Sequence, residues 1–199
     1  QHMLDNFDIK RVSLGGPIFD VEKLSWLNGL WIREDLDCEQ LADRLHEWAL
    51  NRDYLLQILP HAQKRMETLS DFAPLAAFFA AGQLPITEQD FAECKLQGDD
   101  LVQALQFALW KLEALRNWQR DDIFAAMKDL ADALDIKVKD FFAPLFIAIA
   151  GTTASVSVID SMTILGPDMS RARVRHALNT LGGVGKKKLK KLEKAFAAL

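Results

Sequence analysis

The stretch LVQALQFALWKLEALRNW, residues 101–118, decides the fold class. Its apolar side chains recur every three or four residues, which is the period of one face of an α-helix. The positions are Leu101, Leu105, Ala108, Leu112 and Leu115. The sequence contains no convincing alternation of period two, which would indicate a half-buried strand. We therefore predict an all-α protein.

Regular helical patterns follow this stretch to the end of the chain. The expected helices cover residues 121–134, 137–151, 155–166, 169–183 and 186–199. Pro144 is expected to kink the second of them or to delay its start, because proline lacks a backbone N–H. Ser155 is a candidate cap for the third helix, and Gly182 or Gly183 is expected to end the fourth.

The pattern before residues 101–118 is less regular. An apolar stripe runs through residues 38–50, two short helical turns at 52–59 and 62–69 are expected to break at Pro60, and residues 72–80 are apolar. The next segment, 82–100, is polar and contains a proline, which favours a boundary. We therefore divide the chain into residues 1–33, 34–97 and 98–199, the last two as successive helical bundles.

The first expected helix begins at the candidate N-cap Asp20 and mixes polar with apolar positions. At about 100° per residue, Lys23 falls between Trp26 and Leu27, and Asn28 also lies among apolar residues. A lysine and an asparagine in such positions require either a polar partner or a route to solvent.

The bulk composition is that of an ordinary globular protein, with half of the 199 residues apolar and 26% charged. No apolar run approaches the roughly 18 residues of a membrane span, and no signal peptide is visible. Cys38 and Cys94 fit no metal spacing, so we expect reduced thiols in a cytoplasmic protein. The opening residues 1–3, Gln-His-Met, look like a cloning remnant, which predicts a chain that begins within a longer protein.

Charge is distributed unevenly. The net charge is −4, but residues 170–199 hold nine of the 24 basic residues and one of the 28 acidic ones. That segment therefore carries +8 and residues 1–169 carry −12. The asymmetry indicates either a surface for an anionic partner or a solvated C-terminal helix.

Motifs for catalysis are absent from the sequence. There is no glycine-rich phosphate loop, no HExxH, no GxSxG and no cysteine–histidine metal set. The carboxylate pairs Asp99-Asp100 and Asp121-Asp122 stand where helices begin, which capping and the helix dipole explain. We predict no catalytic and no metal-binding residue, and therefore a binding module.

The segment FDVEKLSWLNGLWIRE, residues 19–34, resembles the segment that follows the catalytic half of bacterial glutamyl-tRNA synthetases, where Phe-Asp precedes a K-L-x-W-x-N run. The resemblance continues through residues 65–79, 101–118, 141–166 and 170–178, and so covers nearly the whole chain. It implies that residues 1–33 end the stem-contact region. The rest would be the all-helical anticodon-binding part of the class I type, without the catalytic Rossmann domain and its HIGH-like and KMSKS-like motifs.

The resemblance also implies a function. The partner would be tRNA(Glu), bound by a monomer in the cytoplasm. This chain would need no cofactor and would be inactive alone, whereas the full-length ligase would use ATP to join glutamate to tRNA(Glu).

Arg65, with Lys64 beside it, is the principal site residue that the resemblance implies. In the family, an arginine just before a stretch like METLSDF (residues 66–72) recognises the third anticodon base. Guanidinium is a rigid fork of donors, and unpaired cytosine offers acceptors at O2 and N3. Arginine at this position therefore implies discrimination against tRNA(Gln).

The loop GTTASVSV, residues 151–158, is implied to complete the anticodon pocket. Small hydroxyl residues and backbone amides at a helix start suit an unstacked base or a phosphate, although capping by Ser155 would explain them equally. The implied residues are Gly151, Ser155, Val156, Ser157 and Val158. Phe146 replaces an arginine that some family members carry, and either packs in the core or stacks on a base.

Contacts with the tRNA backbone are implied for residues at both ends of the chain. They are Lys23, Asn28, Arg171, Arg173 and Arg175. Lys23 could follow Trp26 and Leu27, packed on one side of the helix, to a phosphate at its edge. Each of these residues has an ordinary alternative, a solvated side chain or, for Asn28, a bond that fixes the adjacent turn.

Two other classes of protein remain open at this stage. The segment LGGVGKKKLKKLEKA, residues 181–195, resembles a helix–hairpin–helix element, in which amides of a glycine-rich turn hold a DNA phosphate. Alternatively, the chain is an all-α protein-binding module whose basic end keeps it in solution. Neither alternative predicts any preference for an anticodon.

Overall fold

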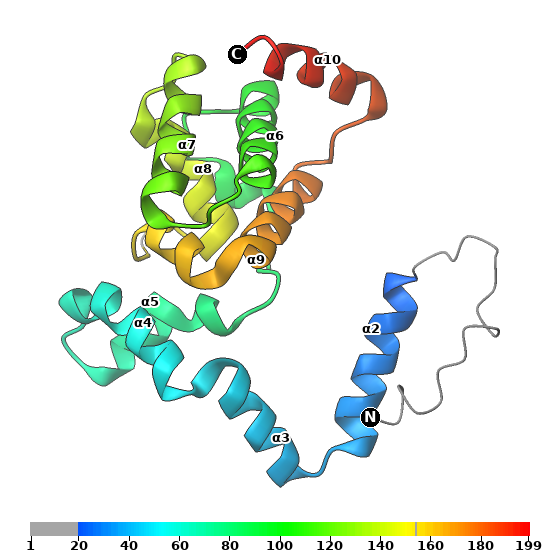
Figure 1. The fold of residues 1–199 in the computed structure, drawn as a ribbon, viewed down its shortest axis with the longest axis vertical. Helices are drawn as coiled ribbons and strands as arrows, with labels where there is room; N and C mark the ends of the chain where they lie inside the picture. Colours follow the sequence, from blue (N-terminus) through cyan, green and yellow to red (C-terminus); the bar gives the residue numbers. More distant parts are fainter. Residues whose placement is uncertain (1–19, 154) are drawn as a thin grey trace. The chain divides into compact units, whose positions relative to one another are not determined.

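The computed structural model describes residues 20–153 and 155–199, and this part of the chain is helical without a strand (Figure 1). The predicted all-α class is confirmed. Contacts divide the chain into two compact units, Gln1–Trp48 and Ala49–Leu199, which we describe separately. This division does not test the boundaries predicted after residues 33 and 97, which stay predictions. The suspected cloning remnant at residues 1–3 lies outside the described residues.

The first unit contains α2 (Val21–Leu30), a π-helical turn (Trp31–Asp35) and α3 (Cys38–Leu45). A second π-helical turn, His46–Leu50, continues α3. Asp20 caps α2 as predicted, because its carboxylate accepts a hydrogen bond from the Lys23 amide at 2.9 Å. A reciprocal capping box between Asp37 and Gln40 starts α3.

The apolar residues of α2 do not pack as expected. Trp26 is 59% exposed and Leu27 is 45% exposed, and Lys23 and Asn28 are exposed beside them. The expectation that Lys23 extends along a packed apolar side is therefore wrong for the described residues, since nothing described there covers these side chains.

The second unit contains the larger helices. They are α4 (Arg52–Ala62), α5 (Phe72–Ala76), α6 (Gly98–Ala114), α7 (Arg120–Ala133), α8 (Val138–Ala150), α9 (Val158–Thr180) and α10 (Lys186–Phe196). Short 3₁₀ turns, Gln63–Arg65, Leu69–Asp71, Ala77–Ala80 and Glu88–Phe91, join α4, α5 and α6.

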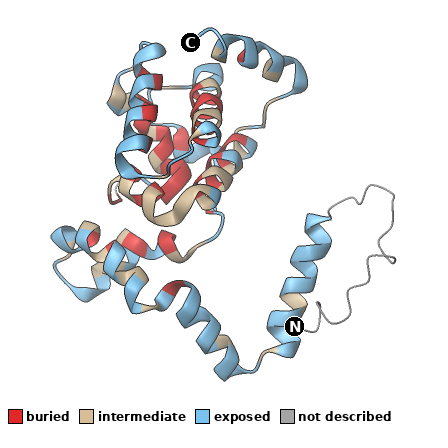
Figure 2. Ribbon diagram, in the orientation of Figure 1, coloured by how far each residue is buried: buried red, intermediate tan, exposed pale blue. Residues whose placement is uncertain are grey.

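Helix α6 lies at the centre of the second unit's core. It contains most of the stretch 101–118 and buries Leu101, Leu105, Phe107 and Leu112 almost completely. Helices α7, α8, α9 and α10 pack around it, and Figure 2 shows buried segments on α6 and on α8 beside it. The buried cluster extends from Ile58 on α4 to Leu192 on α10, so one core joins the whole unit.

The prolines interrupt less than the sequence predicted. Helix α4 continues through Pro60 to Ala62, so the expected break is wrong. Helix α8 begins at Val138, well before Pro144, which excludes a late start. Both helices are held by burial of their apolar faces, which compensates for one missing backbone donor. The expected helices 155–166 and 169–183 both occur, joined within α9 by a kink at Gly166.

The end of α9 was predicted correctly. Gly182 and Gly183 have positive φ angles of 89° and 71°. Their amides donate to the carbonyls of Asn179 and Leu178, at 3.1 and 2.9 Å, which is the pattern of a Schellman motif. Glycine adopts this left-handed conformation without a steric penalty.

Within residues 20–153 and 155–199, no helix has both the length and the hydropathy that a membrane span requires. Neither Cys38, which is exposed, nor Cys94, which is buried, forms a disulfide.

Candidate nucleic-acid interface

The structure brings Arg65 together with the loop between α8 and α9. Arg65 lies in the 3₁₀ turn that ends α4, where it is exposed. Its Nη1 donates a hydrogen bond to the carbonyl oxygen of Ser155, which is 90 positions away in sequence. The contact uses one of five guanidinium N–H donors and holds the side chain while the residue remains open to solvent.

The segment after Arg65 is fixed by one carboxylate. Asp71 accepts hydrogen bonds from the amides of Glu67 and Thr68, at 2.8 and 2.7 Å. These backbone donors lower the pKa of the Asp71 carboxyl below its usual value of 3.8. The turn that carries Arg65 is therefore followed by an ordered loop rather than a loose one.

An ion-pair cluster connects α4 with α7 and α9 close to Arg65. Asp160 in the first turn of α9 binds Arg120 Nε at 2.8 Å and lies 3.6 Å from His61 Nδ1. His61 precedes Arg65 by one helical turn. The cluster thus joins the helix that presents Arg65 to the helix that follows the Ser155 loop.

The loop residues themselves have mainly structural roles. Gly151 ends α8 in the left-handed conformation, with φ 76°. Ser157 caps α9 by accepting a hydrogen bond from the Asp160 amide at 3.4 Å, so the candidate cap Ser155 was wrong.

Three of the predicted loop contacts lack an accessible side chain. Ser155, Val156 and Val158 are each at most 2% exposed. The Ser155 hydroxyl donates to the Val156 carbonyl at 3.1 Å. A base contact through these side chains is therefore wrong, because all three residues pack in the core.

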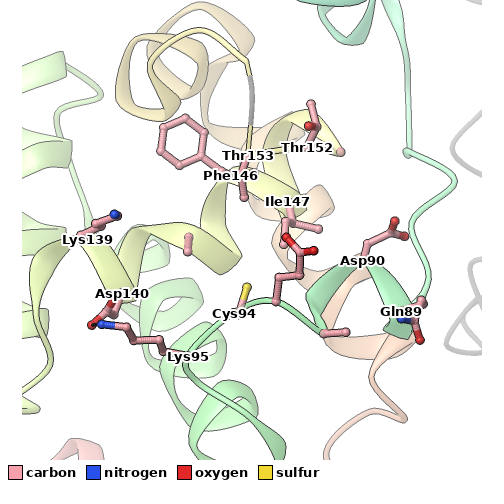
Figure 3. Close-up of a pocket in the computed structure, with 14 residues that line it drawn as sticks. Gln89, Asp90, Cys94, Lys95, Lys139, Asp140, Phe146, Ile147, Thr152 and Thr153 are labelled. Carbon is pink, nitrogen blue, oxygen red and sulfur yellow. Dashed lines mark hydrogen bonds and ion pairs between the residues drawn. The ribbon is translucent and has the colours of Figure 1, made fainter.

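A cavity of about 640 Å³ opens beside this loop (Figure 3). It is lined by Phe146, which is half-buried, by Gly151, Thr152 and Thr153, and by a segment from Gln89 to Lys95. Lys95 binds Asp140 at 3.0 Å on its rim, and Lys139 is a second cation there. The resemblance singled out Phe146, Gly151 and the loop that contains both threonines, but no pattern indicated Lys95 or Lys139.

Arg173 was expected to contact phosphate, and this prediction is wrong. Its side chain is fully buried, at 0% exposure. The guanidinium donates to the carbonyls of Phe78, Ala81, Gly82 and Ile149 at 2.5 to 3.0 Å. Burial lowers the pKa of Arg173 to about 10, which keeps it charged at neutral pH. The residue fastens the end of the α5 region to α8 and α9.

The other predicted backbone contacts divide into two groups. Arg171 donates to the Leu112 carbonyl at 2.9 and 3.2 Å and lies over the Trp118 ring, and Arg175 pairs with Glu113 at 2.7 Å. Both therefore have partners within the protein. Lys64, Lys23 and Asn28 are exposed, which is compatible with a phosphate contact but does not test it.

An exposed guanidinium such as that of Arg65 can stack on an unpaired base or donate to its edge. Residues 40–178 match the family described as "Anticodon binding domain", and the chain belongs to this family.

Curated relatives share much higher identity than chance allows. A glutamate–tRNA ligase of Cellvibrio japonicus is 65% identical over 197 residues, covering 99% of this chain and 39% of the relative. The corresponding ligase of Saccharophagus degradans is 61% identical, covering 100% of this chain and 40% of the relative. The chain therefore spans about 40% of the length of these relatives.

Solved structures support the fold. A glutamate tRNA ligase from Elizabethkingia meningosepticum, in complex with its amino acid, covers 90% of this chain with a TM-score of 0.60. This chain covers 36% of that structure at 19% sequence identity. At that identity the match supports a shared fold and no statement about function. The resemblance predicted from the sequence is confirmed, and the alternative of an unrelated protein- or DNA-binding module receives no support.

Proposed function

We propose that this chain binds the anticodon loop of tRNA(Glu) and that Arg65 recognises the third anticodon base. The family, the relatives named glutamate–tRNA ligase and the accessible guanidinium of Arg65 support the proposal. The observation that carries it is the Arg65–Ser155 contact, because it orients a bidentate donor group beside the loop that the resemblance implicates.

The chemistry follows from the geometry of guanidinium. Two N–H groups of Arg65 donate to O2 and N3 of an unpaired cytosine, whereas guanine presents a donor where cytosine has an acceptor. The Ser155 contact limits the rotation of the side chain before RNA arrives, which lowers the entropic cost of binding. The result is preference for the glutamate anticodon over the glutamine anticodon.

The chain contributes binding rather than chemistry. In a longer protein that includes a catalytic domain, it would hold the anticodon end of tRNA(Glu) while glutamate is activated with ATP and transferred. Alone, the chain is monomeric, cytoplasmic, free of cofactor and without ligase activity.

A short RNA hairpin with the anticodon arm of tRNA(Glu) tests this proposal directly. We expect the chain to bind this hairpin more tightly than one with the same stem and an unrelated loop, in a fluorescence anisotropy titration. Equal affinities that fall steeply with salt would indicate binding to phosphates alone and would contradict anticodon recognition.

A further inference from the structure

Helix α10 is anchored to the second unit by one apolar stripe. Leu192 is buried, and the Phe196 ring lies 5.1 Å from the ring of Phe107 and 5.3 Å from that of Trp110. Both aromatic partners belong to α6. Helix α10 is therefore held on α6 in one orientation, and its opposite face is defined.

That opposite face carries five exposed lysines: Lys186, Lys187, Lys190, Lys191 and Lys194. At 100° per residue they occupy a sector of about 140° that faces away from the apolar stripe. No acidic residue lies within the sector, since Glu193 falls just outside it beside Lys186. We call these five residues the lysine face.

One lysine of α10 lies outside the lysine face and has a different role. Lys188 Nζ pairs with Asp99 at the start of α6, at 2.7 Å. The pair adds a polar attachment to the apolar anchors. The helix is thus fixed at its start as well as along its buried stripe.

The lysine face conflicts with the local rules for helix stability. Lys186, Lys190 and Lys194 are successive like-charged neighbours at a spacing of four, and such pairs are destabilising. Lysines also occupy the first turn, near the positive end of the helix dipole, and no acidic residue is there. Features that oppose local stability mark functional positions more often than structural ones.

Solubility does not explain the lysine face. Residues 1–169 already carry a net −12, so the protein is well charged without these lysines. The arginines of α9, which precede the face in sequence, have partners inside the protein. The positive charge that remains presented to solvent in residues 170–199 is concentrated on α10.

The hairpin before α10 is compatible with close approach of an anion. At Gly182, Gly183 and Gly185 the space where a Cβ would stand is open. Gly185 is the N-cap of α10 and supplies no side-chain acceptor to the first amides. The first amides of α10 therefore lack a side-chain cap and lie beside the lysine face as donors.

We propose that the lysine face binds the phosphodiester backbone of RNA. The choice of RNA rests on the function proposed above. Helix α10 lies at the opposite end of the second unit from α4 and α5, so the bound phosphates lie away from the base that Arg65 recognises (Figure 1). The lysine face therefore contributes affinity that does not depend on the anticodon.

The test compares two double variants with the same loss of charge. One is Lys190→Gln with Lys194→Gln, on two successive turns of the lysine face. The control is Lys128→Gln with Lys137→Gln, two exposed lysines elsewhere in the second unit. Glutamine keeps the helix propensity close to that of lysine. Far-UV circular dichroism and urea unfolding establish that both variants fold.

The readout is the salt dependence of tRNA(Glu) binding between 50 and 200 mM salt, with the third anticodon base as C and as G. Each lost phosphate contact reduces the slope of log K against log salt by roughly 0.7 to 0.9. We expect the Lys190/Lys194 variant to lower the slope by about 1 to 2, equally for both tRNAs, and the control to leave it near the wild-type value.

Equal slopes for wild type, variant and control would overturn the lysine-face proposal while leaving the preference for C intact. Loss of slope in the Lys190/Lys194 variant of a chain that shows no preference for C would support the lysine face and contradict the proposed function. No measurable binding of either tRNA by the wild type would overturn both.

Discussion

Helices α9 and α10 carry two sets of basic residues that look alike in the sequence and differ in the structure. Arg171 and Arg173 on α9 are directed to backbone carbonyls of the protein's own helices. The lysine face of α10 is directed to solvent. The positive charge of residues 170–199 therefore divides into an internal half, Arg171 and Arg173, which bonds to the protein itself, and an external half, the lysine face, which is open to solvent.

The difference reflects the two kinds of cation. A planar guanidinium presents five donors in fixed directions, so it can satisfy several carbonyls at once where water is excluded. An ammonium is more strongly hydrated and is favoured at the surface. The comparison teaches that the type of basic residue, with its place relative to the apolar stripe, is more informative than the net charge of a segment.

Removing the buried member of the internal half should have the largest effect. Arg173→Ala removes the guanidinium donor of four carbonyls and opens a cavity, so we expect a loss of about 3–5 kcal/mol in the free energy of unfolding. Urea denaturation measures it. Arg175→Ala is the matched control, since its exposed pair with Glu113 should contribute less than about 1 kcal/mol. Similar losses in both variants would remove the distinction between buried and exposed arginine.

An intermediate effect is expected at Arg171. Arg171→Ala removes a donor to the Leu112 carbonyl in the last turn of α6 and a cation–π contact with Trp118, so we expect a loss of about 1–2 kcal/mol. Urea unfolding gives the value, and tryptophan fluorescence reports the altered environment of Trp118. If Arg171→Ala lost as much unfolding free energy as Arg173→Ala, burial of the arginine would not determine how strongly each one stabilises the protein.

The smallest effect concerns the one tethered lysine of α10. A hydrogen bond from Lys188, its charge and, least of the three, the charge of Lys191 hold the pKa of the Asp99 carboxyl below its usual value of 3.8. Because the folded pKa is depressed, the pair stabilises the protein above the unfolded pKa, and this stabilisation is lost as pH falls through the folded pKa.

An NMR titration of the Asp99 carboxyl carbon tests this expectation. The pKa should lie below 3.8 in the wild type and rise toward its ordinary value in Lys188→Gln. Lys190→Gln, on the lysine face, should leave it unchanged. An equal rise in both variants would show that the lysines of α10 act as a diffuse charge rather than as one tether and one free face.

Much of the fold followed from periodicity. The pattern of residues 101–118 predicted α6, and Gly182 predicted the end of α9. Pro60 was misjudged because burial of α4 against the core outweighs one lost hydrogen bond. The exposure of Trp26 was also missed, since periodicity indicates an apolar face without showing what covers it.

The candidate site was less predictable than the fold. The resemblance singled out Arg65 and the loop at residues 151–158, but no pattern indicated that Arg65 would meet the Ser155 carbonyl. Arg173 could not be distinguished from its neighbours either, because three of its four acceptors come from a segment more than 90 positions away. The role of each arginine depends on packing between segments that are distant in sequence, and a single sequence shows no pattern that indicates which segments meet.

The most direct test of the central claim is a binding cycle with two proteins and two tRNAs. Wild type and Arg65→Gln are titrated with tRNA(Glu) carrying C or G as its third anticodon base, at one fixed salt concentration. A good bidentate base contact provides about 1–3 kcal/mol of discrimination. We predict that the wild type prefers C by this margin and that Arg65→Gln binds both tRNAs alike. Equal binding by the wild type, or a preference for C that survives in Arg65→Gln, would contradict the assignment of base recognition to Arg65.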